Sequence, residues 1–267
     1  TEGELYVGCA GGIDTVGVFT PTMEAVGEGL KAYQLIVKGL KGGHSGMDIN
    51  LGRGNANKFM NTLLYRCTEN FGLRLATING GSLRNAIPRE SFATVVIPAD
   101  KENEFLAYIP EFEAVVKEQF ANTEPFLSIT AEPAEMPKEV IDMNTQKNLI
   151  EAIAAYPNGA LGMSKDFEGT VETSSNLAIV KTEGNEIMTA SLQRGIVDAK
   201  KDELAAQIRK LLTEHGAKAE SSGEYPGWQP NINSPILKTM QKVYKEKYGK
   251  EPKIMVIHAG LECGILG

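Results

Sequence analysis

The sequence is poor in cysteine and carries no excess of positive charge, and each shortage excludes a class of protein. Cys9, Cys67 and Cys263 are an odd number without paired spacing, so they predict free thiols in a reducing cytoplasm instead of a disulfide framework. A net charge of -7 argues against nucleic-acid partners and anionic membranes. No apolar run is long enough to span a bilayer, so we expect no membrane partner.

Histidine is also scarce, which bears on metal binding. His44, His215 and His258 are far apart in the sequence, and none lies in an HxxxH or CxxC spacing. The sequence also lacks a GxSxG nucleophile elbow, a P-loop and a GxGxxG turn between strand and helix. The residues alone therefore predict neither a metal site nor a complete active site within this chain.

Strands and helices alternate along the chain, which predicts an α/β (α+β) fold. The first set of elements is a strand at 31–40, a helix at 51–69, strands at 73–79 and 91–98, and a helix at 103–120. The second set is a strand at 126–132, a helix at 145–155, strands at 171–181 and 186–194, a helix at 199–214 and a strand at 217–222. Both sets follow the β-α-β-β-α order of ferredoxin-like units.

This recurrence favours a middle domain at 27–224 that consists of two tandem ferredoxin-like units, 27–122 and 123–224. The outer pieces, 1–26 and 225–267, are expected to pair in a second domain around it, because chain ends often lie together in one domain. The chain opens directly on an apolar strand and stops in what looks like the start of a helix. We therefore expect it to be a segment of a longer polypeptide.

A glycine-rich turn between a predicted strand and a predicted helix carries the strongest functional signal. Gly42, Gly43 and Gly46 surround His44, and glycine lets the backbone adopt positive φ and approach a ligand closely. Loops held on a rigid scaffold often carry chemistry. We therefore interpret His44 as a hydrogen-bond donor to a developing oxyanion, over the alternative of a structural histidine. His258, after a buried-looking strand, is interpreted as structural.

Four further residues suit a polar ligand, each with a structural alternative. Arg194 ends an apolar strand, where it can bind a carboxylate through two N–H groups or be a solvated cation. Asn85, in the turn before Pro88, offers a donor and an acceptor, although turn formation accounts for it equally well. Gly260 and Glu262 lie at a strand-to-helix junction, where free N–H groups favour an anion and an acidic side chain suits the helix dipole.

Four segments resemble the aminoacyl-histidine dipeptidases (Xaa-His dipeptidases of the carnosine-cleaving type) in the same order along the chain. These segments are 7–12, 40–58, 171–177 and 258–264. Such dipeptidases belong to a larger family of di-zinc metallopeptidases with a catalytic domain and an inserted lid domain. The resemblance implies that this chain is the lid with adjoining catalytic-domain strands, and that the ligands of two zinc ions lie before and after it.

The resemblance also implies roles for individual residues. His44 matches the lid histidine that polarises the scissile carbonyl and stabilises the tetrahedral intermediate, and Asn85 is similar to the lid asparagine that helps hold the substrate. Arg194 looks like the arginine that binds the substrate's free carboxylate, and the segment from Gly260 to Glu262 corresponds to a substrate-lining loop. The strand at 91–98 lacks the terminal arginine of many relatives, which leaves Arg194 as the candidate.

The implied parent protein is a cytoplasmic zinc dipeptidase that hydrolyses Xaa-His dipeptides, with zinc activating the attacking water and with a homodimer through the lid as one arrangement. This chain alone is expected to be inactive. Two alternatives stay open on the sequence. The first is a non-catalytic binding or dimerisation module of ferredoxin-like units, and the second is the lid of a related aminopeptidase or N-acyl-amino-acid hydrolase.

Overall fold

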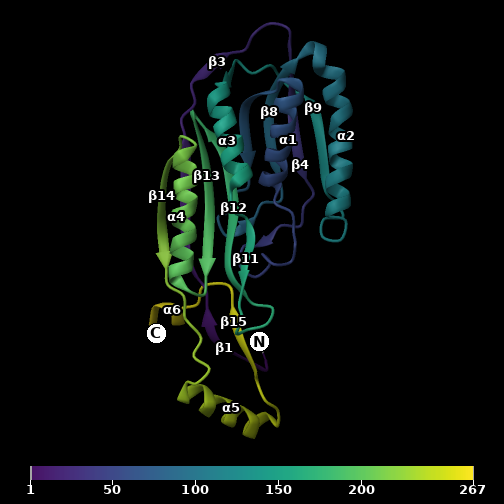
Figure 1. The fold of residues 1–267 in the computed structure, drawn as a ribbon. Coiled ribbons are helices and arrows are strands. Elements are labelled where there is room, and N and C mark those ends of the chain that lie inside the picture. Colours follow the sequence, from purple (N-terminus) through teal and green to yellow (C-terminus); the bar gives the residue numbers. More distant parts are fainter. Residues whose placement is uncertain (1, 267) are drawn as a thin grey trace.

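A computed structural model describes residues 2–266, which form a broad body and a narrow extension (Figure 1). The body is built on one antiparallel sheet. From one edge to the other its strands are β14 (Lys218–Tyr225), β2 (Gly11–Phe19), β13 (Glu186–Gly195), β12 (Val171–Glu183), β6 (Arg74–Gly80), β8 (Ser91–Pro98), β4 (Leu30–Lys38) and β9 (Ser128–Pro133). A further strand, β11 (Gly159–Met163), pairs with β12 away from this path.

Four helices cover one face of this sheet (Figure 1): α1 (Ala56–Phe71), α2 (Glu102–Gln119), α3 (Met143–Ala155) and α4 (Asp198–Glu214). One apolar cluster joins them to the strands and includes Leu35, Leu63, Phe105, Ile150 and Ile208. Burial of such side chains contributes about 1.5–3 kcal/mol each, so the helix face of the sheet is the main core.

The first helix begins at Ala56 and not at residue 51 as the sequence predicts. The side chain of Asn55 accepts hydrogen bonds from the amides of Asn57 and Lys58 at 3.0 and 3.2 Å, which fixes the helix start. At the other end Gly72 adopts a φ of 68°, the left-handed cap that glycine favours.

The strands form two ferredoxin-like units that are nested. The inner unit is β4-α1-β6-β8-α2-β9, with β9 completing it beside β4 through six paired residues. The outer unit is β2-α3-β12-β13-α4-β14, and the inner unit is inserted between β2 and α3. In each unit the fourth strand lies beside the first, followed by the third and the second.

This arrangement differs from the predicted tandem units at 27–122 and 123–224 in two ways. The strand predicted to open the second unit, β9, instead closes the first. The second unit takes its first strand from β2, which the sequence analysis placed in the outer piece 1–26. Sequence order cannot reveal either pairing, because the partners of β2 lie far along the chain.

The two units meet edge to edge at β6 and β12, where Gly80 pairs with Val180 and Asn79 with Lys181. The amide of Ile78 also donates to the hydroxyl of Thr182 at 2.9 Å. These bonds make the two units one continuous sheet.

Two short antiparallel pairs accompany the body. In the first, β3 (Met23–Ala25) pairs with β10 (Glu139–Ile141), and in the second, β5 (Gly43–His44) pairs with β7 (Ala86–Ile87). A 3-10 turn, Ala99–Lys101, precedes α2. The second pair carries His44 and thereby positions the candidate site.

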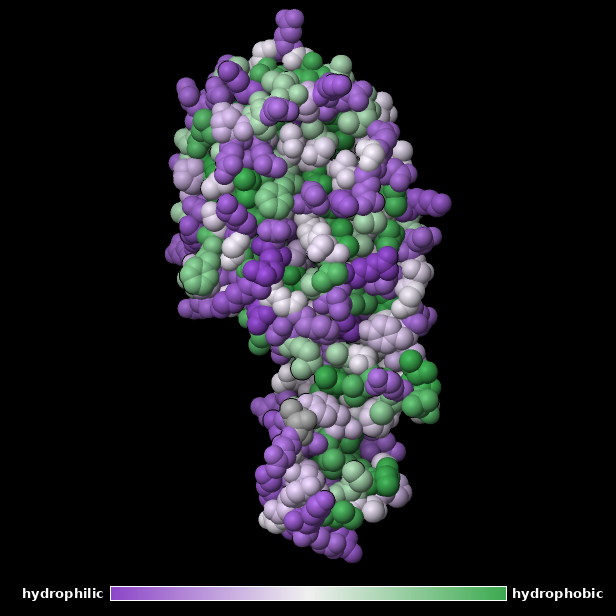
Figure 2. Space-filling model, turned by 180° about the vertical axis from the view of Figure 1, so that it is seen from behind, coloured by the Kyte–Doolittle hydropathy of each residue, from purple (hydrophilic) through white to green (hydrophobic). Residues whose placement is uncertain are grey.

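The narrow extension contains the parallel strands β1 (Glu4–Cys9) and β15 (Lys253–Ile257), with α5 (Pro235–Tyr248) and α6 (Cys263–Leu266). Hydrophobic side chains reach its surface (Figure 2). Ile236, Met240 and Val243 lie on one face of α5 and are 67%, 47% and 52% exposed. Parallel sheets are normally packed against other elements on both faces. The parallel pair of β1 and β15 has unusually few elements packed against it. Among residues 2–266, no helix has the length and apolar character needed to cross a membrane.

Candidate functional site

The turn that carries His44 holds its imidazole in one protonation state. The Nδ1 atom of His44 accepts hydrogen bonds from the amides of Gly46 and Met47, both at 3.1 Å. An accepting Nδ1 carries no proton, so the proton of the neutral ring lies on Nε2. Burial and the charge of Arg194 hold the pKa of His44 below its usual value, against the opposing charge of Asp48. His44 is therefore a neutral Nε2–H donor near pH 7.

Two features shape this turn. The carboxylate of Asp48 accepts from the His44 amide at 2.8 Å and pairs with Arg53 at 3.2 Å. Gly42 and Gly43 have φ angles of 63° and 143°, a region in which side chains with a Cβ are strained. The glycine-rich sequence is thus required by backbone conformation at the residues that lead into His44.

Arg194 lies at the end of β13 and is only 3% exposed. Its Nη1 donates to the hydroxyl of Tyr225 at 2.6 Å, whereas Nε and Nη2 both reach the hydroxyl of Ser45 at 3.4 Å. Within residues 2–266 no carboxylate lies close enough to form an ion pair with it. Burial lowers the pKa of Arg194 and outweighs the Tyr225 hydroxyl and the carboxylate of Asp14, which favour its charge. Arg194 is therefore suited to an anionic ligand.

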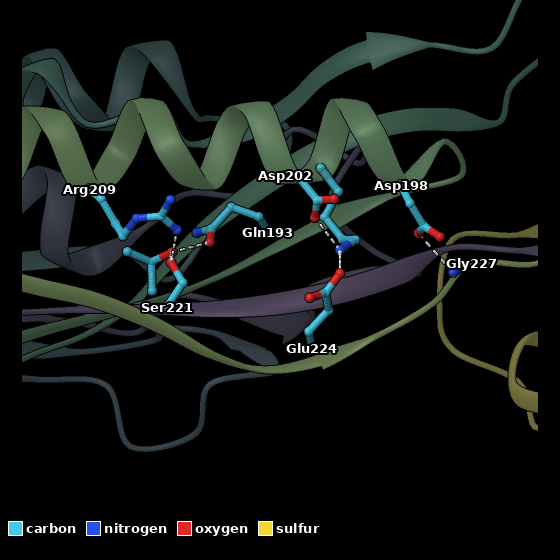
Figure 3. Close-up of polar contacts among 9 residues, drawn as sticks. Gln193, Asp198, Asp202, Arg209, Ser221, Glu224 and Gly227 are labelled. Carbon is cyan, nitrogen blue, oxygen red and sulfur yellow. Dashed lines mark hydrogen bonds and ion pairs between the residues drawn. The ribbon is translucent and has the colours of Figure 1, made fainter.

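Gln193, the neighbour of Arg194 on β13, belongs to a polar network with Ser221 and Arg209 (Figure 3). Successive side chains of a strand point to opposite faces, and Gln193 accordingly faces α4. The side-chain oxygen of Gln193 accepts a hydrogen bond from the hydroxyl of Thr15 at 2.7 Å. The same Thr15 hydroxyl lies 2.9 Å from the hydroxyl of Ser221. Arg209 on α4 donates to Ser221 at 2.8 Å. This network fixes the strand that presents Arg194.

Asn85 is exposed and lies next to the His44 turn, because its main-chain carbonyl accepts from the amide of Ser45 at 2.8 Å. The buried side chain of Asn176 donates to the carbonyl of Ala86 at 2.8 Å. Asn176 on β12 in the outer unit therefore holds the inner-unit loop that carries Asn85.

His258 is buried, and its main-chain carbonyl lies against Gly46 of the His44 turn. Its Nε2 is 2.7 Å from the hydroxyl of Ser174 on β12. Burial, with the charges of Arg194 and His44, lowers the pKa of His258 to about 3. The side chain is thus neutral and held within the fold, in keeping with a structural role.

The remaining two predicted site residues lie farther along the same segment. Gly260 is exposed, and a Cβ at this position would lie 2.8 Å from the ring of Tyr225. Glu262 is exposed, and its main-chain carbonyl accepts from Ile265 and Leu266 at the start of α6. In the described part of the chain its side chain joins no hydrogen bond or ion pair, so no direct contact ties Glu262 to His44 or Arg194.

No metal site is formed by the part of the chain that the structure describes. Between residues 2 and 266, no three His, Cys, Asp or Glu side chains come together in a way that could hold an ion. Structural and catalytic metal sites need at least three converging protein ligands. The described residues therefore do not fit the zinc pair that the resemblance implies.

Three residues of the site were not singled out from the sequence. Ser45 and Asn176 lie within the segments that resemble the dipeptidases, but nothing local distinguishes them as site residues. Tyr225 lies outside those segments, and only the three-dimensional structure places it against Arg194. With His44 and Arg194, these residues form a group in which a neutral donor lies beside a buried cation.

Known proteins resemble this chain over part or nearly all of its length. Residues 35–124 match the family described as the peptidase dimerisation domain. The cytosol non-specific dipeptidase of Escherichia coli (strain K12) is 40% identical over 264 residues, which are 99% of this chain and 54% of that protein. The crystal structure of aminoacylhistidine dipeptidase from Vibrio alginolyticus superposes with a TM-score of 0.95 at 41% identity, again covering 99% of this chain and 54% of that one.

The chain thus spans about half the length of both relatives, at 54% coverage of each. The resemblance of this chain to the aminoacyl-histidine dipeptidases is confirmed along nearly its whole length, and its residues 35–124 match the peptidase dimerisation domain.

Proposed function

We propose that this chain is part of a metal-dependent dipeptidase that hydrolyses Xaa-His dipeptides, and that it supplies the lid and the substrate-binding groups. One observation carries the proposal: a 3% exposed Arg194 without a carboxylate partner among residues 2–266 lies next to a neutral His44. A dipeptide offers a terminal carboxylate for the first group and, close to it, a scissile carbonyl for the second. The names of the two relatives support the same reaction class.

In this proposal each group of the site has one task. The Nε and Nη2 edge of Arg194 binds the substrate carboxylate and exchanges its 3.4 Å contacts with Ser45 for two charge-assisted hydrogen bonds. The Nε2–H of His44 donates to the scissile carbonyl oxygen and stabilises the negative charge that develops there. Asn85 helps hold the substrate, and Gly260 and Glu262 line the approach to it.

The nested fold supports a proposed division into two domains. The large sheet from β2 to β14 is the proposed lid, and the extension with β1, β15 and α5 is the proposed contribution to the catalytic domain. We place the proposed boundaries near residues 10 and 226, because β2 pairs with β13 and β14. The zinc ligands are proposed to lie in the remainder of the parent protein, and this chain alone is proposed to be inactive.

The test of this function is the preference for a free carboxylate in the full-length enzyme. Arg194→Met should lower kcat/KM for an Xaa-His dipeptide by about a hundredfold, since a bidentate charged contact is lost. Arg194→Met should leave hydrolysis of the same dipeptide with an amidated C-terminus almost unchanged. Arg66→Met, which removes an exposed cation on α1, is the matched control. An unchanged preference in Arg194→Met would overturn the assignment.

We further propose that the parent enzyme is cytoplasmic and forms a homodimer through the inner unit. The match of residues 35–124 to a dimerisation domain supports this partner, and the inner unit leaves the edge of β9 without a neighbouring strand. Val115 on α2 and Phe126 before β9 are 54% and 79% exposed. Replacing both with aspartate should shift the mass in sedimentation equilibrium from dimer to monomer, whereas an unchanged dimer would exclude this surface.

A further inference from the structure

Tyr225 occupies the point where the chain leaves the large sheet for the extension. It is the last residue of β14, and its hydroxyl accepts the 2.6 Å hydrogen bond from Nη1 of Arg194. This bond is far shorter than the two 3.4 Å contacts that the same guanidinium makes with Ser45. Tyr225 is thus the strongest protein partner of Arg194.

Two glycines lie against the ring of Tyr225, Gly12 near its Cε1 edge and Gly260 near its Cε2 edge. A Cβ at Gly12 on β2 would overlap the ring, and a Cβ at Gly260 after β15 would lie 2.8 Å from Cε2. Neither glycine has positive φ, so space for the ring, and not backbone conformation, is the reason for glycine at both positions. The hydroxyl therefore has one position, set by a strand of the body and a segment of the extension.

This packing determines how the guanidinium is presented. Arginine carries five N–H groups in a rigid plane, so one short bond at Nη1 fixes the direction of the Nε and Nη2 edge. That edge is left with only weak hydroxyl contacts. We propose that Tyr225 is a positioning residue that orients Arg194 for the carboxylate of the substrate, an inference that rests on the proposed function of Arg194.

The experiment uses the full-length enzyme with Tyr225→Phe, which removes the hydroxyl and keeps the ring. KM for an Xaa-His dipeptide should rise about tenfold, with kcat within about twofold, because one hydrogen bond to a charged group is lost. The C-terminal amide should be cleaved as before. In an Arg194→Met background, the same Tyr225→Phe change should have no further effect, since Tyr225 acts through Arg194.

Tyr156→Phe is the matched control. Like Tyr225→Phe, it removes a tyrosine hydroxyl that bonds to a residue of β13; here the tyrosine is buried and its partner is Ser191, at 2.7 Å. The side chain of Ser191 points to the face of β13 opposite that of Arg194. Tyr156→Phe should lower stability without changing KM. As a second variant, Gly12→Ala should displace the Tyr225 ring and raise KM in the same direction.

The outcomes separate this inference from the function on which it rests. If Arg194→Met leaves the carboxylate preference intact, the proposed function fails. If Arg194→Met abolishes the preference while Tyr225→Phe keeps both KM and the preference, the role of Tyr225 is overturned. Additive effects of the two substitutions on kcat/KM would also overturn it, because they would mean that Tyr225 acts independently of Arg194.

Discussion

Gly46 lies against the main-chain carbonyl of His258, and a Cβ added at Gly46 would overlap that oxygen. The turn that presents His44 therefore packs directly on the segment that follows β15. Two parts of the chain that are about two hundred residues apart in sequence thus set the position of one imidazole.

Gly46→Ala should push the His44 turn away from the segment that follows β15. The overlap forces a backbone shift, for which overpacking costs of about 1–3 kcal/mol are typical. We expect a lower midpoint of urea unfolding and reduced turnover in the full-length enzyme. Gly27→Ala is the control, because a Cβ at Gly27 meets nothing within 4 Å. Equal stability of the two variants would show that the contact tolerates a side chain.

His44→Ala in the full-length enzyme should lower kcat by about 10²–10³-fold, the effect of removing one donor to an oxyanion. Metal content measured by elemental analysis should stay the same, since His44 belongs to no metal cluster among residues 2–266. His215→Ala, at the end of α4, serves as the control. Unchanged turnover in His44→Ala would remove this residue from the mechanism.

His258 should make the fold sensitive to mild acid. Burial lowers its pKa to about 3 in the folded protein, against 6.5 for the free side chain, so below pH 6.5 the unfolded chain binds the additional proton. Stability is therefore fully present above pH 6.5 and falls as the pH drops toward 3, by about 2 kcal/mol at pH 5.

The measurement for His258 is urea unfolding at pH 7.5 and pH 5 for the natural protein and for His258→Gln. The glutamine does not titrate, so the loss between the two pH values should be smaller in the variant by about 2 kcal/mol. Identical losses would mean that another group causes the acid sensitivity.

Lys201 on α4 is fully buried and binds Asp202 and Glu224 at 2.6 and 2.9 Å. Figure 3 shows the two carboxylates on α4 and on β14. Burial opposes the charge of Lys201, but the two carboxylates outweigh it and raise its pKa. Lys201→Met should lower the free energy of unfolding by about 1–3 kcal/mol. This loss is smaller than that for breaking a fully buried ion pair, because Asp202 and Glu224 remain half-exposed to water.

The neighbouring Lys200 provides the comparison in the same urea titration. It pairs with Glu172 at the surface and is 51% exposed, so Lys200→Met should cost less than about 0.5 kcal/mol. Similar losses in both variants would mean that burial of Lys201 contributes little.

Local patterns predicted most of the elements because their signals are local. Alternation of apolar residues located β8 at 91–98, and apolar periodicity located α2 and α4. In contrast, β2 was missed because its sequence contains three glycines and reads as a connection. Gly12 is glycine to admit the Tyr225 ring and Gly17 to admit Leu212, which are requirements of distant residues.

The residues of the candidate site likewise differ in whether a local sequence pattern predicts them. His44 was found because its turn has a local glycine signature, and Arg194 because it ends an apolar strand. Tyr225 and Asn176 carry no such signal, since their partners belong to other strands. Residues that hold functional groups in place are defined by contacts across the fold, which a pattern along the chain does not record.

The nested topology has a consequence for biosynthesis. A chain that grows from its N-terminus completes the inner unit, from β4 to β9, before any residue of β12 has been made. Meanwhile β2 waits for partners such as Ser191, which lies 176 residues after Thr15. The inner unit can therefore fold while the edge of β6 is still uncovered, and the outer unit can close around it only after β12 to β14 have been made.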